Sequence, residues 1–487
     1  MKKKIAIIGG GIAGLAAAFR LANANSNLRD ADRLDISIFE KRKFLGGRAA
    51  SFFDKEAGLF VDHCQHVGMQ CCTFFRDFCE QAGISNEFQT LDKLNFFLPN
   101  GKKVDFAASR LLPAPFHLAP AFLALSNFSF RQRISIARTV FQLAKADVSN
   151  DPITYDWLIE KGQEESVIHD FWETFLVSAL GERIERVSLR AAKKVFVDGF
   201  LRNRHAYHVL VPKKPLRELL DENACHRLTE AGVNVVRDTD YESISQINEE
   251  GFQLQRPQQA SGSIGFNDQF SDARFSDCIC TLPWFQTSSF LSKELGQKIA
   301  LKTAMTSNCP SPISGIHLWF DRPITDLSHA TFIGKTSHWL FNGSLFSKSR
   351  SKSTSESGEY YYQIVISSDM GSELNRKDLI QVILGELKET FSDSQNAQLL
   401  RHKFIEEKKA VFSYTANLDS SRPAQRTAVK NFYLAGDWTN TDWPSTMESA
   451  VRSGYFAADE LLSNYGIEKT DLPSELPTGW LARRFVD

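Results

Sequence analysis

Apolar and polar residues near the N-terminus follow the order strand, glycine-rich turn, helix and strand. Residues 5–8 (IAII) form a short apolar run, which is typical of a strand buried on both faces. Residues 15–21 (LAAAFRL) favour a helix, and residues 35–40 (DISIFE) favour a second strand. The polar stretch between them, residues 23–33, predicts a long helix end or a loop. This order predicts an α/β architecture for the start of the chain.

A second strand and helix are expected in the C-terminal part of the chain. Residues 432–435 (FYLA) predict a short strand, and a helix is expected from about residue 445 to residue 462. Ser445 and Thr446 are the alternative N-caps of that helix. A hydroxyl oxygen at this position can accept a hydrogen bond from a free N–H group of the first turn.

The middle of the chain alternates as a strand that is buried on one face. In residues 311–321 (SPISGIHLWFD), the period of two places His317, Trp319 and Asp321 together on one face. Residues 360–367 are the expected partner strand. This part of the chain therefore predicts a sheet separate from the N-terminal one.

Two apolar stretches admit more than one interpretation. Residues 111–130 (LLPAPFHLAPAFLALSNFSF) are strongly apolar, but prolines interrupt them too often for a helix that spans a bilayer. Core packing and an apolar entrance lying against a membrane surface are both open. Together with residues 479–486 (GWLARRFV), this stretch predicts peripheral contact with a membrane, and a plain soluble protein is the alternative. Residues 157–189 are predicted to be mostly helical.

Glycines at the first turn give the N-terminal pattern a chemical meaning. Gly9, Gly11 and Gly14 fit the pattern G-x-G-x-x-G, in which they allow a tight turn, close approach of a diphosphate and close helix packing. The N–H groups that follow, including those of Ile12 and Ala13, are expected to bind the diphosphate at the positive end of the helix.

An acidic residue after the second strand completes a dinucleotide-binding pattern. Glu40 is placed to accept hydrogen bonds from ribose hydroxyls. It comes later than the roughly 20 residues usual for this pattern, and the polar residues 23–33 account for the excess. A glycine-rich core turn is the structural alternative, and it does not explain Glu40.

Two motifs at opposite ends of the chain carry a resemblance to a known superfamily. Residues 41–48 (KRKFLGGR) and 434–454 (LAGDWTNTDWPSTMESAVRSG) resemble the FAD motifs of the phytoene desaturase, amine oxidase and protoporphyrinogen oxidase superfamily. The resemblance implies an α/β fold with a Rossmann-like FAD-binding domain built from discontinuous segments, and an α+β substrate-binding domain. The FAD-binding segments expected are 1–70, 205–290 and 402–465, the substrate-binding segments are 71–204 and 291–401, and a C-terminal tail covers 466–487.

The second motif combines this resemblance with the physics of a helix N-terminus. Asp437 is expected to hydrogen-bond the ribityl or diphosphate region of FAD. The positive helix end around Met447 and Glu448 is expected to face the flavin N1/C2=O edge, where negative charge collects on reduction. By resemblance Arg48 contacts the diphosphate. The cofactor-binding residues expected are Gly9, Gly11, Ile12, Ala13, Gly14, Glu40, Lys41, Gly46, Gly47, Arg48, Gly436, Asp437, Thr446 and Met447.

A narrower resemblance indicates one branch of the superfamily. Residues 62–66 (DHCQH), 311–321, 421–423 (SRP) and 435–439 (AGDWT) resemble the squalene-associated FAD desaturases, which are hydroxysqualene dehydroxylases. The resemblance implies an isoprenoid lipid substrate and replacement of the allylic hydroxyl of hydroxysqualene by hydride from reduced flavin. The chain has no second dinucleotide fingerprint, so NAD(P)H would have to bind another surface, or a separate reductant or reductase must supply the electrons.

Three residues are candidates for the acid that this reaction needs. Asp62, His66 and His317 can each donate a proton to a departing hydroxyl. For each of them a structural hydrogen bond is the competing interpretation. Cys64 stands where the related D-x-G-x-H pattern has glycine.

Three other functions remain open at this point. A carotene desaturase would share both FAD motifs but transfer hydride to the flavin. An amine oxidase would need an aromatic cage near the C-terminal motif, where Trp438 and Trp443 lie. A non-catalytic FAD-binding scaffold in a lipid-synthesis complex is the third alternative.

Composition and charge narrow the class of protein. The 487 residues are 43% hydrophobic with a formal net charge of -1, which offers no electrostatic case for nucleic acid. The eight cysteines lack the spacing of a metal site or disulfide framework, so we expect free thiols and no metal. Residues 1–4 (MKKK) before an apolar run imitate a signal peptide, but the glycine fingerprint makes that run a buried strand. The expected compartment is the cytoplasm, with peripheral contact at the inner face of the membrane left open.

Overall fold

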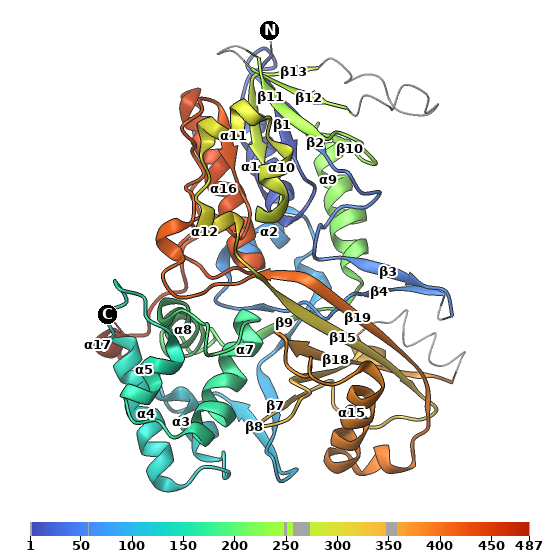
Figure 1. The fold of residues 1–487 in the computed structure, drawn as a ribbon, viewed down its shortest axis with the longest axis vertical. Coiled ribbons are helices and arrows are strands. Elements are labelled where there is room, and N and C mark those ends of the chain that lie inside the picture. Colours follow the sequence, from blue (N-terminus) through green and yellow to red (C-terminus); the bar gives the residue numbers. More distant parts are fainter. Residues whose placement is uncertain (1, 57, 248–250, 257–272, 347–357, 487) are drawn as a thin grey trace.

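The computed structural model describes residues 2–56, 58–247, 251–256, 273–346 and 358–486. Figure 1 shows an upper part built around a parallel sheet and a lower part in which helices and a second sheet lie beside each other. The N-terminus lies at the top, and the C-terminus lies next to the lower helices.

The upper sheet has five parallel strands in the order β10-β2-β1-β14-β20. Segments that are far apart in the chain supply these strands, which confirms an α/β fold whose parallel sheet is assembled from discontinuous pieces. The strands are β1 (Lys4–Ile8), β2 (Asp35–Phe39), β10 (Asn234–Val236), β14 (Asp277–Cys280) and β20 (Phe432–Leu434).

Both faces of this sheet are covered, as its apolar strands require. Ile5 and Ile7 face a core formed with helices, whereas Ala6 and Ile8 face a second core on the other side. The first face carries α1 (Ile12–Ser26), α2 (Thr73–Gln81), η5 (Arg217–Asn223), α9 (Ala224–Glu230) and α16 (Met447–Asn464). The second carries β11 (Ser243–Gln246), β12 (Phe252–Gln255), β13 (Arg274–Phe275), α10 (Trp284–Phe290), α11 (Lys293–Ile299) and α12 (Thr303–Thr306).

The lower sheet is mixed and has seven strands in the order β19-β15-β18-β17-β16-β7-β8. The strand expected at residues 311–321 is β15, and it pairs antiparallel with β18, the predicted partner. Leu318 and Phe320 pack toward α15 (Arg376–Thr390), whereas His317 and Trp319 lie on the opposite face. The strands are β7 (Lys93–Phe97), β8 (Lys103–Ala107), β15 (Pro310–Phe320), β16 (His329–Phe332), β17 (Trp339–Asn342), β18 (Tyr360–Ser367) and β19 (Leu399–Phe412).

Helices beside the lower sheet enclose an aromatic core. The rings of Phe171, Trp172, Phe175 and Phe196 pack together, and the centroids of the contacting rings are 4.9 to 6.0 Å apart. The predicted helical region 157–189 is confirmed as several short helices. The helical elements here are η2 (Phe116–Leu118), α3 (Ala119–Leu123), α4 (Phe130–Ala144), α5 (Thr154–Glu160), α6 (Glu165–Val167), η3 (Ile168–Glu173), α7 (Thr174–Leu180), α8 (Leu189–Phe196) and η4 (Val197–Leu201).

The apolar residues 111–130 divide between core and surface. Leu118 and Leu125 are buried in the helical core, whereas Leu111 and Phe130 are 91% and 71% exposed. Core packing therefore explains the buried apolar residues of this stretch but not the exposed ones. Across the described ranges, no helix is long and apolar enough to cross a membrane.

Small elements connect the two parts of the molecule. They are β3 (Ser51–Asp54) paired with β4 (Leu59–Asp62), the sheet of β5 (Gly68–Met69), β9 (Val209–Pro212) and β6 (Phe88–Leu91), η1 (Ser85–Glu87), α13 (Gly343–Phe346), η7 (Ser392–Asn396) and η8 (Asp419–Ser421).

The C-terminal segment is anchored in the upper part by Arg20, which bonds Thr470, and by Arg452, which pairs with Glu475. It ends in α17 (Arg483–Val486), which lies against α4.

Glycine allows α1 and α16 to pack closely. A Cβ placed on Gly454 of α16 would lie 2.3 Å from the carbonyl oxygen of Ala13 in α1. We expect Gly454→Ala to lower the free energy of unfolding by about 1–3 kcal/mol, because the two helices must separate. Gly385 in α15 is the matched control. No described atom lies within 4 Å of its added Cβ, so Gly385→Ala should stabilise the protein by about 0.5–1 kcal/mol. Thermal unfolding of both variants checks this, and equal melting temperatures would contradict it.

Candidate functional site

The glycine-rich turn after β1 places no side chain over the N-terminus of α1. Gly9 has a φ of +106°, a conformation that side chains rarely adopt. Gly14 packs on the turn so closely that a Cβ there would lie 2.0 Å from the carbonyl oxygen of Gly9. Gly11 is the N-cap of α1 and gives no side-chain cap, so the helix start at Ile12 and Ala13 is open to an anionic ligand.

A second glycine loop lies directly against the first. The N–H of Gly46 donates to the carbonyl oxygen of Gly10 at 2.9 Å. A Cβ on Gly47 would lie 3.1 Å from the Cα of Gly11. The two loops therefore form a cradle of bare backbone.

Glu40 joins the end of β2 to this cradle. One carboxylate oxygen accepts the N–H of Gly10 at 2.7 Å, and the other accepts the N–H of Arg42 at 2.8 Å. A carboxylate has further lone pairs, so these bonds leave capacity for hydroxyl groups of a ligand. The neighbouring Lys41 is exposed at the surface.

An ion pair joins the two motifs from opposite ends of the sequence. The guanidinium of Arg48 pairs with the carboxylate of Asp437, and Ser445 donates a hydrogen bond to the other oxygen of Asp437. Arg48 also donates to the carbonyl oxygen of Ala410 at 3.0 Å. Gly436, which precedes Asp437, adopts a φ of +140°.

The helix after this motif begins with Met447, and Thr446 is its N-cap. The carboxylate of Glu448 accepts two backbone N–H groups in the first turn of α2, at 3.2 and 2.7 Å, and pairs with Arg452. Burial raises the pKa of Glu448 above its ordinary value, although Arg452 opposes this shift. The side chain of Glu448 thus connects α16 to α2 instead of facing the free end of the helix.

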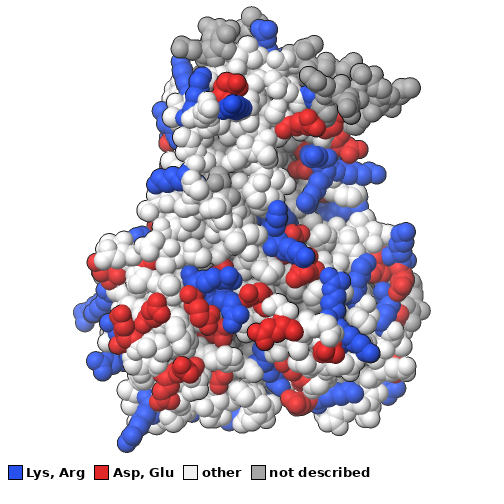
Figure 2. All heavy atoms as spheres, viewed as in Figure 1, with Lys and Arg blue, Asp and Glu red and all other residues white. Residues whose placement is uncertain are grey.

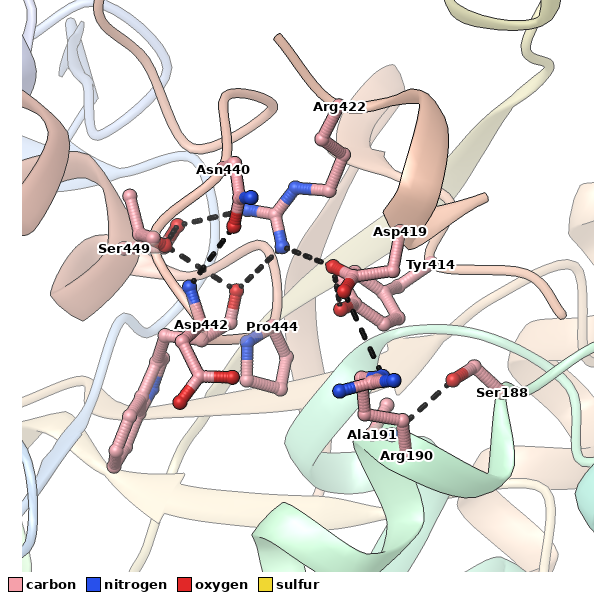
Figure 3. A network of polar contacts seen from close by, with 12 residues as sticks. Ser188, Arg190, Ala191, Tyr414, Asp419, Arg422, Asn440, Asp442, Pro444 and Ser449 are labelled. Atoms are coloured by element: carbon pink, nitrogen blue, oxygen red, sulfur yellow. Dashed lines mark hydrogen bonds and ion pairs between the residues drawn. The ribbon is translucent and has the colours of Figure 1, made fainter. Parts of the chain in front are cut away.

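Arg422 holds the loop between β20 and α16 (Figure 3). Its side chain is completely buried. The guanidinium donates to the carbonyl oxygens of Trp443 and Asp437 at 2.9 and 3.0 Å, and to the hydroxyl of Ser449 at 3.3 Å. It also pairs with Asp419 at 3.3 Å. The sequence singled out residues 421–423 by resemblance alone, and burial of this arginine has no local sequence signal.

Among the candidate acids, Asp62 is held by structural hydrogen bonds. The carboxylate is buried and accepts the hydroxyl of Ser51 at 2.6 Å and the N–H of Leu216 at 2.8 Å. These bonds connect the β3–β4 hairpin to the start of η5, which supports the structural interpretation for Asp62.

His66 lies in the segment between β4 and β5. Its Nδ1 lies 3.0 Å from the carbonyl oxygen of Cys64 and 3.9 Å from the sulfur of the same residue. Burial lowers the pKa of His66, but Cys64 and, more weakly, Asp62 outweigh burial and raise this pKa to about 9. The raised pKa makes His66 a candidate proton donor.

His317 lies within a buried aromatic cluster. Its Nδ1 is 2.8 Å from the hydroxyl of Tyr361, and its ring stacks on Tyr361 and Trp319. The side-chain amide of Gln363 lies 3.5 Å from Nε2 and also donates to the carbonyl oxygen of Asp62 at 3.3 Å. The backbone of residues 63–64 crosses β15 beside His317, at Gly315. The three candidates thus come from neighbouring segments, and the sequence did not indicate Tyr361 or Gln363.

Comparison with known proteins decides the family. The protein-family model of the flavin-containing amine oxidoreductases matches residues 12–462 of this chain. The chain belongs to this family. The curated relatives include a hydroxysqualene dehydroxylase from Sinorhizobium fredii, 25% identical over 95% of this chain and 99% of the relative. They also include a 15-cis-phytoene desaturase from an Oncidium hybrid, 24% identical over 95% and 78%, and a zeta-carotene desaturase from Synechocystis, 21% identical over 95% and 97%.

Solved structures share the fold of this flavin-containing oxidoreductase. An oxidoreductase from Methanosarcina mazei superposes with a TM-score of 0.66 at 16% identity, covering 94% of this chain and 100% of that one. Cyclohexylamine oxidase from Brevibacterium oxydans superposes with a TM-score of 0.64 at 15% identity, covering 96% and 100%.

The cradle fits the FAD that the family uses. Its bare glycine backbone leaves room for a diphosphate beside the positive end of α1. Arg48 would supply a positive charge beside this diphosphate, and Glu40 would supply acceptors for ribose hydroxyls. In this flavin-containing oxidoreductase, the described residues include no group of three metal ligands, and all eight cysteines are free.

We expect Asp437→Asn to weaken FAD binding about ten- to hundredfold, because the change removes the charge that Arg48 and Ser445 surround. Asp442 is the matched control. It lies in the same loop with a side chain that is 80% exposed, so Asp442→Asn should bind FAD normally. Flavin absorbance of the purified variants and titration of FAD into the apoproteins measure both effects. Equal FAD affinity of the two variants would exclude a role for Asp437.

Proposed function

We propose that this FAD-dependent oxidoreductase is a hydroxysqualene dehydroxylase. Reduced FAD would supply a hydride to the allylic carbon that loses its hydroxyl. The C–O bond breaks, a C–H bond forms, the flavin is oxidised, and the hydroxyl takes a proton and leaves as water. The products are squalene and water.

The position of His66 beside Cys64 and Asp62, which raise its pKa, is the observation that supports this proposal. A hydroxyl leaves readily only when an acid protonates it, and a histidine with a pKa of about 9 holds that proton at neutral pH. Oxidative desaturation of a hydrocarbon requires no acid for a leaving oxygen. Asp62 and His317 would then position the surrounding segments, as their hydrogen bonds to Leu216 and Tyr361 suggest.

The tryptophans near the C-terminal motif argue against an amine oxidase. Trp438 is completely buried and donates its ring N–H to the carbonyl oxygen of Leu282 at 3.0 Å. Trp443 is also buried, and its ring already contacts two cations of the protein, Lys194 at 4.5 Å and Arg452 at 4.4 Å. Neither ring has a free face for a substrate amine.

The cofactor assignments and domain limits complete the proposal. We infer that the fourteen residues expected from the N-terminal fingerprint and the two motifs hold FAD. The FAD-binding domain would comprise residues 1–70, 205–290 and 402–465, and the substrate-binding domain residues 71–204 and 291–401. Near these limits, α2, α11 and α12 pack on the parallel sheet, whereas β19 belongs to the lower sheet. A separate reductant or reductase would reduce the flavin.

The direct test is anaerobic. The purified protein is reduced and mixed with hydroxysqualene, and we expect flavin reoxidation with formation of one squalene per flavin. The oxidised protein mixed with phytoene or with an amine is the control, and its flavin should stay oxidised. Bleaching by phytoene would replace this proposal with a carotene desaturase, and bleaching by an amine with an amine oxidase. No reaction with any of the three would favour a non-catalytic FAD-binding scaffold.

The pH dependence of this reaction tests His66. Its imidazole is protonated below its pKa, so the rate of squalene formation should fall as the pH rises through about 9. His66→Gln should lose about 10²–10⁴-fold in rate and lose this pH dependence. His63 is the matched control, because burial lowers its pKa and leaves it neutral at pH 7. Cys64→Ala should move the inflection to lower pH. A His66→Gln variant with wild-type rate and pH profile would exclude His66 as the acid.

A further inference from the structure

Two apolar segments that are about 350 residues apart meet on the surface of the helical region. A Cβ on Gly479 would lie 3.2 Å from the Cβ of Ala114. The ring of Phe485 in α17 lies 5.3 Å from Phe116 and also 5.3 Å from Phe141 of α4. The C-terminal segment therefore extends the apolar surface that the loop before α3 begins.

Large apolar side chains project from this junction into solvent. Leu111 is 91% exposed, Trp480 is 71% exposed, and Leu112 is also exposed. We call this surface the terminal patch, and it consists of Leu111, Leu112, Phe116, Phe141, Trp480 and Phe485. A contiguous apolar patch of this kind on a protein surface marks an interaction site.

Basic side chains surround the terminal patch. All of them are exposed, and none forms an ion pair with another described residue. Arg138 lies three residues before Phe141 on α4, and Lys145, the C-cap of this helix, lies four residues after it, so all three are near one helix face. The basic residues are Arg110, Arg138, Lys145, Arg483 and Arg484. Figure 2 shows basic and acidic side chains interspersed over the lower part of the face drawn.

A hollow of about 650 Å³ opens beside the patch, between α4, α5 and α17. Its aromatic lining comes from Phe141, Trp157 and Phe485, and its charged rim is mostly basic. Asp147 is the acid of the lining, and Ser149 donates hydrogen bonds to it through both its N–H and its hydroxyl. The basic residues of the lining are Arg138, Lys145 and Lys161.

We propose that the terminal patch docks on a lipid bilayer that contains anionic lipids. Leu111, Leu112 and Trp480 enter the interfacial layer, where an indole ring is favoured because it is apolar with one polar group. Arg483 and Arg484 contact lipid phosphates, and the hollow receives an anionic headgroup.

Flotation of the full-length, FAD-saturated protein with vesicles tests this proposal. One set of vesicles is phosphatidylcholine alone, and the other contains phosphatidylglycerol as well. We expect flotation mainly with the anionic set, and a decrease as the salt concentration rises. Leu111→Ser/Trp480→Ser and Arg483→Glu/Arg484→Glu should each reduce binding at least about tenfold. Flavin absorbance and melting temperature show that the variants remain folded.

Matched changes elsewhere on the surface serve as controls. Leu400 is exposed on β19, and Lys377 and Lys388 are exposed on α15. Leu400→Ser and Lys377→Glu/Lys388→Glu should float like the wild type. Equal losses in patch and control variants, or no flotation with either set of vesicles, would overturn the proposal. A change in molecular mass in the patch variants without a change in flotation would mean that a second copy of the chain covers the patch. Turnover is not measured here, so the outcome does not depend on the substrate.

Discussion

Close approach of backbone to backbone at a few glycines is the constraint on which the rest of this structure depends. Gly14 lies on the turn at Gly9, Gly47 lies on Gly11, and Gly454 lies on Ala13. A Cβ at Gly14 or Gly454 would meet a backbone oxygen at less than 2.5 Å, and one at Gly47 would be crowded against a Cα. These contacts bring the N-terminal glycine loops and the C-terminal helix α16 together, and they form the cradle that we propose for the FAD diphosphate.

Buried charges hold the surrounding loops in place, and each is surrounded by partners. Asp437 is paired with Arg48, and Arg422 is bonded to the backbone carbonyl oxygens of Asp437 and Trp443, which both precede Pro444. Asp419 extends this network by pairing with Arg190 of α8 at 3.6 Å, as Figure 3 shows. Buried ion pairs contribute little net stability because desolvation opposes the attraction, but removing one partner is costly. The network therefore fixes the position of the loop between β20 and α16 relative to the helical region.

The C-terminal segment connects the part of the molecule with the proposed FAD site to the proposed membrane-docking surface. It starts beside Arg20 in the upper part, passes Arg452, and ends with Phe485 against α4. The same segment thus contacts α1 and α16, which flank the proposed FAD site, and supplies part of the terminal patch. The lipid substrate that we propose would reach the protein from a membrane, which agrees with a docking surface on this segment.

The sequence by itself determined the features that depend on local patterns. The glycine fingerprint, the alternation in β15 and an N-cap at Ser445 or Thr446 are encoded by residues close together in the chain, and the α/β architecture at the start of the chain followed from the first of these; the structure selects Thr446 as the N-cap. Only the tertiary structure decided that Glu448 turns to α2, that the pKa of His66 is raised, and that Arg422 is buried. The first and third depend on contact between segments that are not adjacent in the sequence. The pKa of His66 depends on burial and on how the backbone places the neighbouring Cys64 and Asp62. The meeting of residues 111–116 with the C-terminus has the same cause, because no local pattern records which distant segment covers an apolar surface.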